Sequence, residues 1–265
     1  MPLVAAAVCP HPPLLVPEVA GAAASELDDL RAACETAVRR LVAANPDTVV
    51  LLGAGPASGP IRPPATGSLQ PWGVDLDVPL GPGQPDRGAV LPLSLTIGAW
   101  LLSHHATSPL SHHAASSLSH HAASSLNQHA GSPLGSARVT AVQVTADAGP
   151  AALAALAEDV ATAGDRVALL VLGDGSACRG EKSPGYDDPR ALAYDKRVAT
   201  ALAGADLDGL RDLDPGLSAQ LKVAGWAPWQ VLAGAARQAG GWRGELLYEA
   251  APYGVAYFVA SWERV

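Results

Sequence analysis

Histidine is almost missing from the conventional part of this chain. The sequence holds eight histidines in 265 residues, and seven of them lie inside a repeat between positions 104 and 129. His11 is the only one outside it, in the segment CPHPPLLVPE that follows the apolar run MPLVAAAV. Chemistry that needs an imidazole base or a histidine-rich metal site therefore has one candidate residue outside the repeat.

Cysteine, long apolar runs and excess positive charge are scarce as well. The three cysteines, Cys9, Cys34 and Cys178, are too far apart to suggest a disulfide framework, which favours a reducing cytoplasm. No apolar run approaches the ~20 residues of a membrane-spanning helix. No Lys or Arg precedes the first apolar stretch, so we expect no signal peptide. The net charge of −8 argues against nucleic acid as a partner. We expect a cytoplasmic protein with no membrane partner.

Apolar runs and helical periodicity alternate along the chain. Continuous or alternating apolar runs predict strands at 3–8, 48–52, 74–78, 139–144, 167–172, 245–250 and 255–260. Apolar residues at spacings of three and four predict a helix from Ser25, as its cap, to about Ala44. Further helices are predicted at 89–102, 150–163, 189–204 and 227–239. This alternation predicts one α/β domain over 1–265, with a central, mostly parallel sheet and helices on both faces.

A low-complexity insert interrupts this pattern. Residues 103–134 are four octads, SHHATSPL, SHHAASSL, SHHAASSL and NQHAGSPL. A period of eight matches neither a helical face of about 7.2 residues per two turns nor a standard solenoid repeat. The paired histidines are suited to loose Zn²⁺ or Ni²⁺ binding, and the alternative is an expanded surface loop without function. We expect the domain to fold without this insert.

Two glycine-rich segments follow predicted strands. GAGPASG (53–59) is similar to a dinucleotide-binding loop, but Pro56 and Pro60 stand where a helix should begin. GDGS (173–176) follows the strand at 167–172, where α/β proteins often carry active-site residues. Ser176 as a nucleophile would need a base, and only His11 lies outside the repeat. The alternative is a tight turn in which Asp174 bonds nearby amides.

Four segments in this order resemble the class III extradiol ring-cleavage dioxygenases of the LigB type and their Memo-like relatives. They are CPHPPLL (9–15), DTVVLLGAGP (47–56), LLVLGDGSACR (169–179) with Ala193-Tyr194-Asp195, and Ala224-Gly225-Trp226 with Trp229 ahead of LLYEAAPYGVAYFVA (246–260). The resemblance spans the chain except for the insert. It implies an α/β fold with a metal site at the strand ends. Active members hold Fe²⁺ with two histidines and a carboxylate, and a further histidine serves as acid and base.

The resemblance places several site residues. His11 matches the first metal ligand, whereas the second histidine position reads Gly53-Ala54-Gly55-Pro56 and the acid–base position reads Ala177. Glu249 is the candidate carboxylate, and Asp174 can supply a replacement oxygen. The predicted metal set is thus His11, Asp174 and Glu249, for Fe²⁺, Mn²⁺ or Zn²⁺, with Mn²⁺ or Mg²⁺ suiting the oxygen-rich donors. Ser176 and Arg179 are the predicted substrate-binding residues.

Two further groups have alternative interpretations. An arginine fork made from Arg179 and Arg190, with Asp188 and Asp195 nearby, could bind an anionic substrate, or the four residues could form an ion-pair and capping network. Trp226 and Trp229 are better explained as packing residues than as a ligand platform.

Three functions remain open from the sequence. The first, which we favour, is a diverged dioxygenase-like protein that has lost ring cleavage and keeps a cleft for a small molecule or partner. The second is a metal-dependent oxidoreductase or hydrolytic relative that uses His11 with carboxylates. The third is a non-catalytic subunit of a hetero-oligomer. The missing histidines are the groups that ring cleavage requires, which is why the first is favoured.

Overall fold

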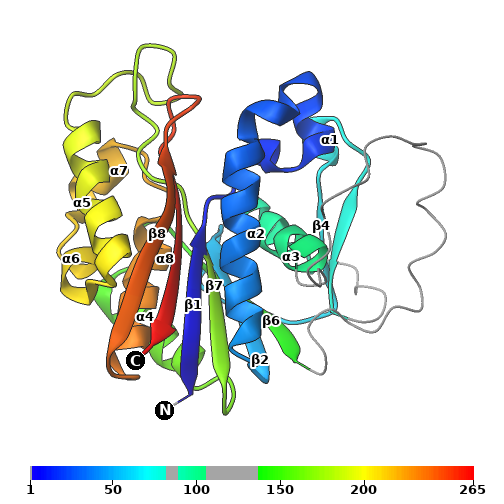
Figure 1. Ribbon diagram of the computed structural model, residues 1–265, viewed down its shortest axis with the longest axis vertical. Coiled ribbons are helices and arrows are strands. Elements are labelled where there is room, and N and C mark those ends of the chain that lie inside the picture. The colour runs from blue at the N-terminus through cyan, green and yellow to red at the C-terminus, as the bar shows by residue number, and fades with distance from the viewer. Residues whose placement is uncertain (1, 82–88, 106–136) are drawn as a thin grey trace.

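The computed structural model describes residues 2–81, 89–105 and 137–265, which form a single α/β domain built on a seven-stranded sheet (Figure 1). The order of strands across the sheet is β3-β6-β2-β7-β1-β9-β8. The strands are β1 (Leu3–Cys9), β2 (Thr48–Ala54), β3 (Gly59–Ile61), β6 (Arg138–Val144), β7 (Val167–Leu172), β8 (Trp242–Ala250) and β9 (Tyr257–Arg264). A separate pair, β4 (Ala65–Ser68) and β5 (Asp77–Leu80), forms a small antiparallel sheet.

The middle of the large sheet is parallel, as predicted. Strands β6, β2, β7 and β1 pair in parallel, while β9 runs antiparallel between β1 and β8, and β3 runs antiparallel to β6. Strand β8 consequently points the same way as the parallel strands. The run VALLVL coincides with β7 because all six of its residues are buried, as in a strand covered on both faces.

Helices cover both faces of the sheet, which confirms the predicted architecture (Figure 1). One face packs against α4 (Pro150–Ala161), α5 (Ala191–Gly204), α6 (Leu207–Arg211), α7 (Pro215–Gln220) and α8 (Trp226–Arg237). The other face packs against α2 (Asp28–Ala43) and α3 (Leu93–His105), with the short α1 (Pro17–Ala20) nearby. Alternate residues of β7 belong to the two cores: Val167, Leu169 and Val171 to one, Ala168, Leu170 and Leu172 to the other.

The structure corrects the predicted start of the first long helix. Ser25 does not cap it, because a 3₁₀ segment, Gly21–Leu27, precedes α2 and Leu27 occupies the cap without a side-chain bond. Asp28 and Asp29 stand in the first turn instead, where negative charge favours the helix dipole. Two further 3₁₀ turns, Pro13–Leu15 and Gln70–Trp72, also escaped prediction. The predicted strand at 74–78 is displaced to β5, outside the large sheet.

The helix predicted at 89–102 ends three residues later, at His105. Helix α3 continues through Ser103, His104 and His105, so the first three residues of the first octad belong to the fold. The His104 ring stacks on Trp100 at a centroid distance of 4.4 Å, and the His105 ring meets Trp100 edge-on. The predicted insert otherwise lies outside the described residues. Within the described ranges, no helix has both the length and the hydrophobicity that a bilayer crossing requires.

Candidate functional site

The ends of β1 and β7 bring His11 and Asp174 together. These neighbouring parallel strands run in register up to Cys9 and Leu172, and the Gly173 amide continues the ladder by donating to the Cys9 carbonyl at 3.0 Å. The chain therefore leaves both strands at the same edge. The His11 backbone amide donates to Asp174 Oδ1 at 2.8 Å, and the imidazole Nδ1 lies 3.6 Å from the same oxygen. Two of the three predicted metal ligands are thus adjacent.

The His11 side chain is buried with one ring nitrogen unsatisfied. His11 is only 9% exposed, and its Nδ1 has no hydrogen-bond partner within the described part of the chain. Buried polar atoms without partners are uncommon and cost about 1–3 kcal/mol each. At 3.6 Å, Asp174 Oδ1 lies beyond hydrogen-bonding distance of Nδ1, so this carboxylate does not satisfy the ring nitrogen.

Tyr257 joins this edge of the sheet, and the sequence reasoning missed it. Strand β9 runs antiparallel to β1 with Val8 opposite Ala260, so the start of β9 lies beside the end of β1. Burial raises the pKa of the Tyr257 phenol, and the negative charge of Asp174 raises this pKa further. The phenol therefore stays protonated and can donate a hydrogen bond. The available signal was topological. A strand that pairs antiparallel with β1 must begin near the carboxyl end of β1, which places Tyr257 there.

Glu249 does not reach the pair. It is exposed on the edge strand β8, directly opposite Phe258, and Phe258 packs against Trp229 in the core beneath α4 and α8. Opposed residues of antiparallel strands share a face, whereas Tyr257 belongs to the other core. Across the residues that the structure describes, no three His, Cys, Asp or Glu side chains gather into a group able to hold a metal ion. The structure thus does not assemble the predicted set of His11, Asp174 and Glu249.

The position of the second family histidine is filled by other side chains. A Cβ on Gly53 would lie 2.6 Å from Ser94 Oγ, and a Cβ on Gly55 would collide with Gln143 Oε1. Ser94 is fixed there because its hydroxyl donates to the Ala54 carbonyl at 2.6 Å. An imidazole at either glycine would displace one of these groups. The residues at this edge do not fit an iron centre of two histidines and a carboxylate.

Ser176 and Arg179 converge on a buried carboxylate. The Ser176 amide donates to Asp195 Oδ1 at 3.0 Å, and its hydroxyl donates to Oδ2 at 2.6 Å. Arg179 Nη1 donates to the same Oδ2 at 3.1 Å. Ser176 and Asp195 are both fully buried, so the predicted substrate-binding serine is closed off from solvent in this structure. Arg179 keeps 29% of its side chain exposed but uses one nitrogen for Asp195.

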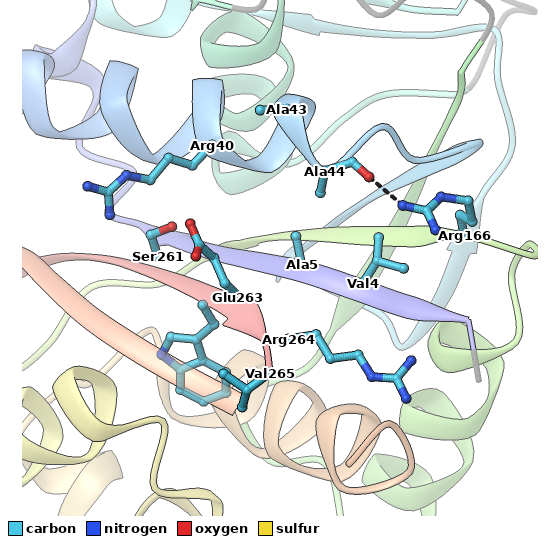
Figure 2. A pocket seen from close by; sticks show the side chains of 11 residues that line it. Val4, Ala5, Arg40, Ala43, Ala44, Arg166, Ser261, Glu263, Arg264 and Val265 are labelled. Atoms are coloured by element: carbon cyan, nitrogen blue, oxygen red, sulfur yellow. Dashed lines mark hydrogen bonds between the residues drawn. The ribbon is translucent and has the colours of Figure 1, made fainter. Parts of the chain in front are cut away.

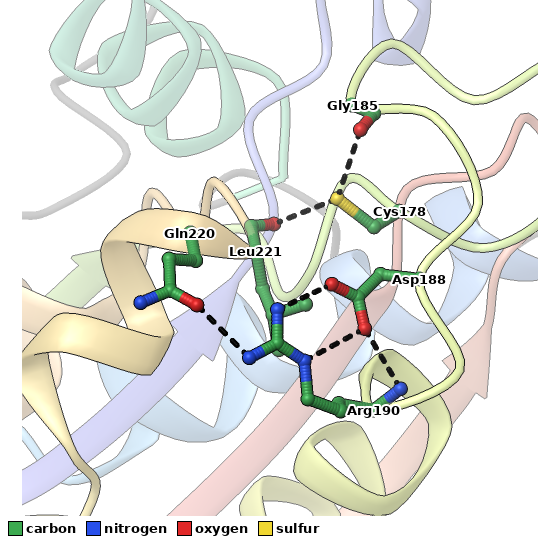
Figure 3. A network of polar contacts seen from close by, with 6 residues as sticks. All are labelled: Cys178, Gly185, Asp188, Arg190, Gln220 and Leu221. Carbon is green, nitrogen blue, oxygen red and sulfur yellow. Dashed lines mark hydrogen bonds and ion pairs between the residues drawn. The ribbon is translucent and has the colours of Figure 1, made fainter.

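The charged residues ahead of α5 form a closed network (Figure 3). Arg190 Nε and Nη2 donate to the two oxygens of Asp188 at 2.9 and 2.6 Å, and Nη1 donates to Gln220 Oε1 at 2.9 Å. This contact lowers the pKa of Asp188 to about 2. Each nitrogen of the Arg190 guanidinium therefore has a protein acceptor, which supports the ion-pair interpretation over an anion-binding fork. Beside it, burial raises the pKa of Cys178, whose thiol donates to the Gly185 and Leu221 carbonyls.

The GDGS segment does not form the tight turn of the alternative interpretation, because the chain makes no turn at 173–176 and the Asp174 carboxylate accepts from the His11 amide, 163 positions away, at 2.8 Å. A Cβ on Gly173 would lie 2.5 Å from the Gly225 Cα, and a Cβ on Gly175 would lie 2.5 Å from the Phe258 ring. Trp229 packs in this core and is fully buried, so its predicted packing role is confirmed. Trp226 is partly buried and donates its Nε1 proton to the Leu213 carbonyl at 3.2 Å.

Comparison with known proteins yields a distant likeness in fold. No protein-family model matches the sequence, and no curated protein matches it significantly. Among solved structures, the chain is similar to the uncharacterized protein JW3007 from Escherichia coli K12 at 15% sequence identity and a TM-score of 0.48. The alignment covers 98% of this chain and 99% of that one.

Proposed function

We propose that this protein binds a small molecule at the edge formed by His11 and Asp174, and that it does not cleave aromatic rings. The observation that carries the proposal is the buried imidazole of His11, whose Nδ1 lies 3.6 Å from Asp174 Oδ1 and has no hydrogen-bond partner in the part of the chain that the structure describes. A two-residue pair of this kind orients a ligand through hydrogen bonds and needs no metal ion. Ring cleavage by the family's route would require the donors that Gly53, Gly55 and Ala177 replace.

The residues at this edge favour a ligand with hydroxyl groups. A neutral His11 ring carries one acceptor nitrogen, and its Nδ1 has no hydrogen-bond partner among the described residues. Tyr257, whose raised pKa keeps the phenol protonated, supplies a donor. Phenols and catechols carry hydroxyl groups that match an acceptor and a donor on neighbouring residues. We therefore choose catechol as the probe.

The test combines binding and turnover. Titration calorimetry should detect catechol binding to the wild type, and His11→Ala should weaken it about tenfold, equivalent to one lost hydrogen bond of about 1.4 kcal/mol. Protein reconstituted with Fe²⁺ without oxygen, then exposed to air and catechol, should take up no oxygen above the metal-only control. Oxygen uptake that depends on His11 would contradict the loss of ring cleavage. Equal catechol affinity in His11→Ala, or no binding at all, would contradict the binding role.

A further inference from the structure

A hollow of about 670 Å³ opens at the opposite edge of the sheet, where β1 begins and β9 ends (Figure 2). Its lining comes from β1, the last turn of α2, the segment before β7, and β9. This edge lies far along the strands from His11 and Asp174, which follow the carboxyl ends of β1 and β7. The hollow is therefore separate from the proposed site.

The lining concentrates positive charge on an acidic protein. Three arginines, Arg40, Arg166 and Arg264, line the hollow with one acidic side chain, Glu263, although the whole chain carries a net charge of −8. Glu263 pairs with an arginine outside the lining, Arg243, at 3.4 Å. Arg40 donates from Nη1 to the carboxylate of Glu245, which also lies outside the lining. The named side chains in and around the hollow are thus four arginines and two glutamates.

Arg166 is held in place and keeps a donor available. Its Nε donates to the Asn45 carbonyl at 3.0 Å, and its Nη2 donates to the Ala44 carbonyl at 2.7 Å (Figure 2). These two bonds fix the guanidinium and occupy the carbonyls at the end of α2. The third nitrogen, Nη1, has no partner among the described residues. An arginine fixed in this way loses little side-chain freedom when it binds an anion.

Polar groups of the sheet itself face the same hollow. Ser261 is only 4% exposed and lines it, and its hydroxyl has no hydrogen-bond partner in the described part of the chain. Val4 lies in the lining where the pairing of β1 with β7 shifts by one residue, so it has no paired residue in either neighbouring strand. Such bulges often occur next to functional sites.

We propose that this hollow binds a small oxyanion-bearing molecule, either a polycarboxylate or a phosphate compound. The spare nitrogen of Arg166 and the hydroxyl of Ser261 donate to the anion, and Arg40 and Arg264 add positive charge. Arginine geometry suits carboxylate and phosphate oxygens equally. The two sources are separated by the choice of probe, citrate for carboxylates and pyrophosphate for phosphates.

Titration calorimetry of the full chain with each probe tests this proposal. Wild-type protein should bind one equivalent of at least one probe, with an affinity that falls as NaCl is raised. Arg166→Ala should weaken binding about tenfold or more, and Ser261→Ala several-fold. Arg237→Ala is the matched control, because this surface arginine pairs with Asp208 away from the hollow. The Arg237→Ala variant should bind each probe with the affinity of the wild type.

Each outcome has a defined meaning. Binding of citrate alone assigns a polycarboxylate, and binding of pyrophosphate alone assigns a phosphate compound. Because Arg166 also bonds the end of α2, Arg166→Ala could unfold the protein, and Ser261→Ala then decides the question. No binding of either probe, or equal weakening in Ser261→Ala and Arg237→Ala, overturns the proposal. His11→Ala should leave this binding unchanged, so failure here is distinguishable from failure of the catechol site.

Discussion

The two edges of the same sheet differ in how their polar groups are used. At the carboxyl edge, the side chains of Ser94 and Gln143 fill the space beside Gly53 and Gly55, and both His11 Nδ1 and Gln143 Oε1 are buried without hydrogen-bond partners among the described residues. At the amino edge, a hollow of about 670 Å³ stays open among arginines. Ligands of α/β proteins usually bind at the carboxyl edge. The comparison shows that topology locates a candidate site, whereas side-chain volume decides which ligands the site accepts.

The largest effect is expected for the buried carboxylate beside the carboxyl edge. Asp195→Ala removes the acceptor of the Ser176 amide, the Ser176 hydroxyl and Arg179. Breaking a buried charged pair should lower the free energy of unfolding by about 3–5 kcal/mol in urea denaturation. Asp208→Ala is the control, because its carboxylate is 71% exposed and its pair with Arg237 should contribute less than about 1 kcal/mol. Similar losses in both variants would contradict the structural role of Asp195.

Filling the carboxyl edge further should have a smaller effect. Gly53→Ala forces a Cβ against Ser94 Oγ, and overpacking of this kind costs about 1–3 kcal/mol. Adding Ser94→Ala should recover part of the loss, since it removes the oxygen that the new Cβ meets. Gly149→Ala is the control, because no atom lies within 4 Å of its added Cβ. If Gly53→Ala is as stable as Gly149→Ala, Ser94 can move aside for the new Cβ, and this end of the sheet is not tightly packed.

The free energy of unfolding should depend on pH through His105, at the end of α3. Burial lowers the pKa of His105 below 6.5, and its Nε2 is buried with no hydrogen-bond partner within 2–81, 89–105 and 137–265. Because the folded state takes up this proton less readily than the unfolded state, stability should fall as the pH drops through 6.5 towards the folded pKa. His105→Gln should reduce that pH dependence, measured as the free energy of unfolding at pH 8 and pH 5.5. The same slope in the variant and the wild type would show that His105 does not cause it.

The smallest effect is expected in the network of Figure 3. Asp188→Asn leaves the exposed Arg190 without its ion partner, and exposed pairs contribute little to stability. No resolvable change in unfolding is expected at pH 7. The pKa of Asp188 is lowered from 3.8 to about 2, so any contribution is present above 3.8 and is lost as the pH falls through about 2. Thermal melts at pH 7 and pH 3 check this, and a large loss at pH 7 would assign the pair a larger role.

The sequence predicts the strands and helices whose residues are buried on one face or on both. The run at 167–172 is apolar throughout, so β7 was predicted to the residue. Strands β3 and β4 were missed because Pro60 and Gly67 break the usual strand pattern in these short edge segments. The start of α2 was misplaced because a serine, the usual cap, lies inside a 3₁₀ segment.

The site was less predictable because its contacts join distant parts of the chain. The pairing of His11 with Asp174 spans 163 positions, yet it could be expected because both follow buried strands that proved to be neighbours. Nothing in the local sequence indicated that Ser94 and Gln143 occupy the space beside the glycines. The bond between Ser176 and Asp195 depends on how α5 packs against the segment after β7, which periodicity does not specify.

Metal titration of protein lacking residues 106–134 tests the central claim most directly. This deletion keeps α3 complete through His105 and removes the five remaining histidines of the repeat. We expect that this protein, with or without His11→Ala, retains no stoichiometric Fe²⁺, Mn²⁺ or Zn²⁺ after gel filtration. One equivalent of metal that the deletion protein retains and that His11→Ala abolishes would contradict it, and would restore the metal-dependent enzyme as the better explanation.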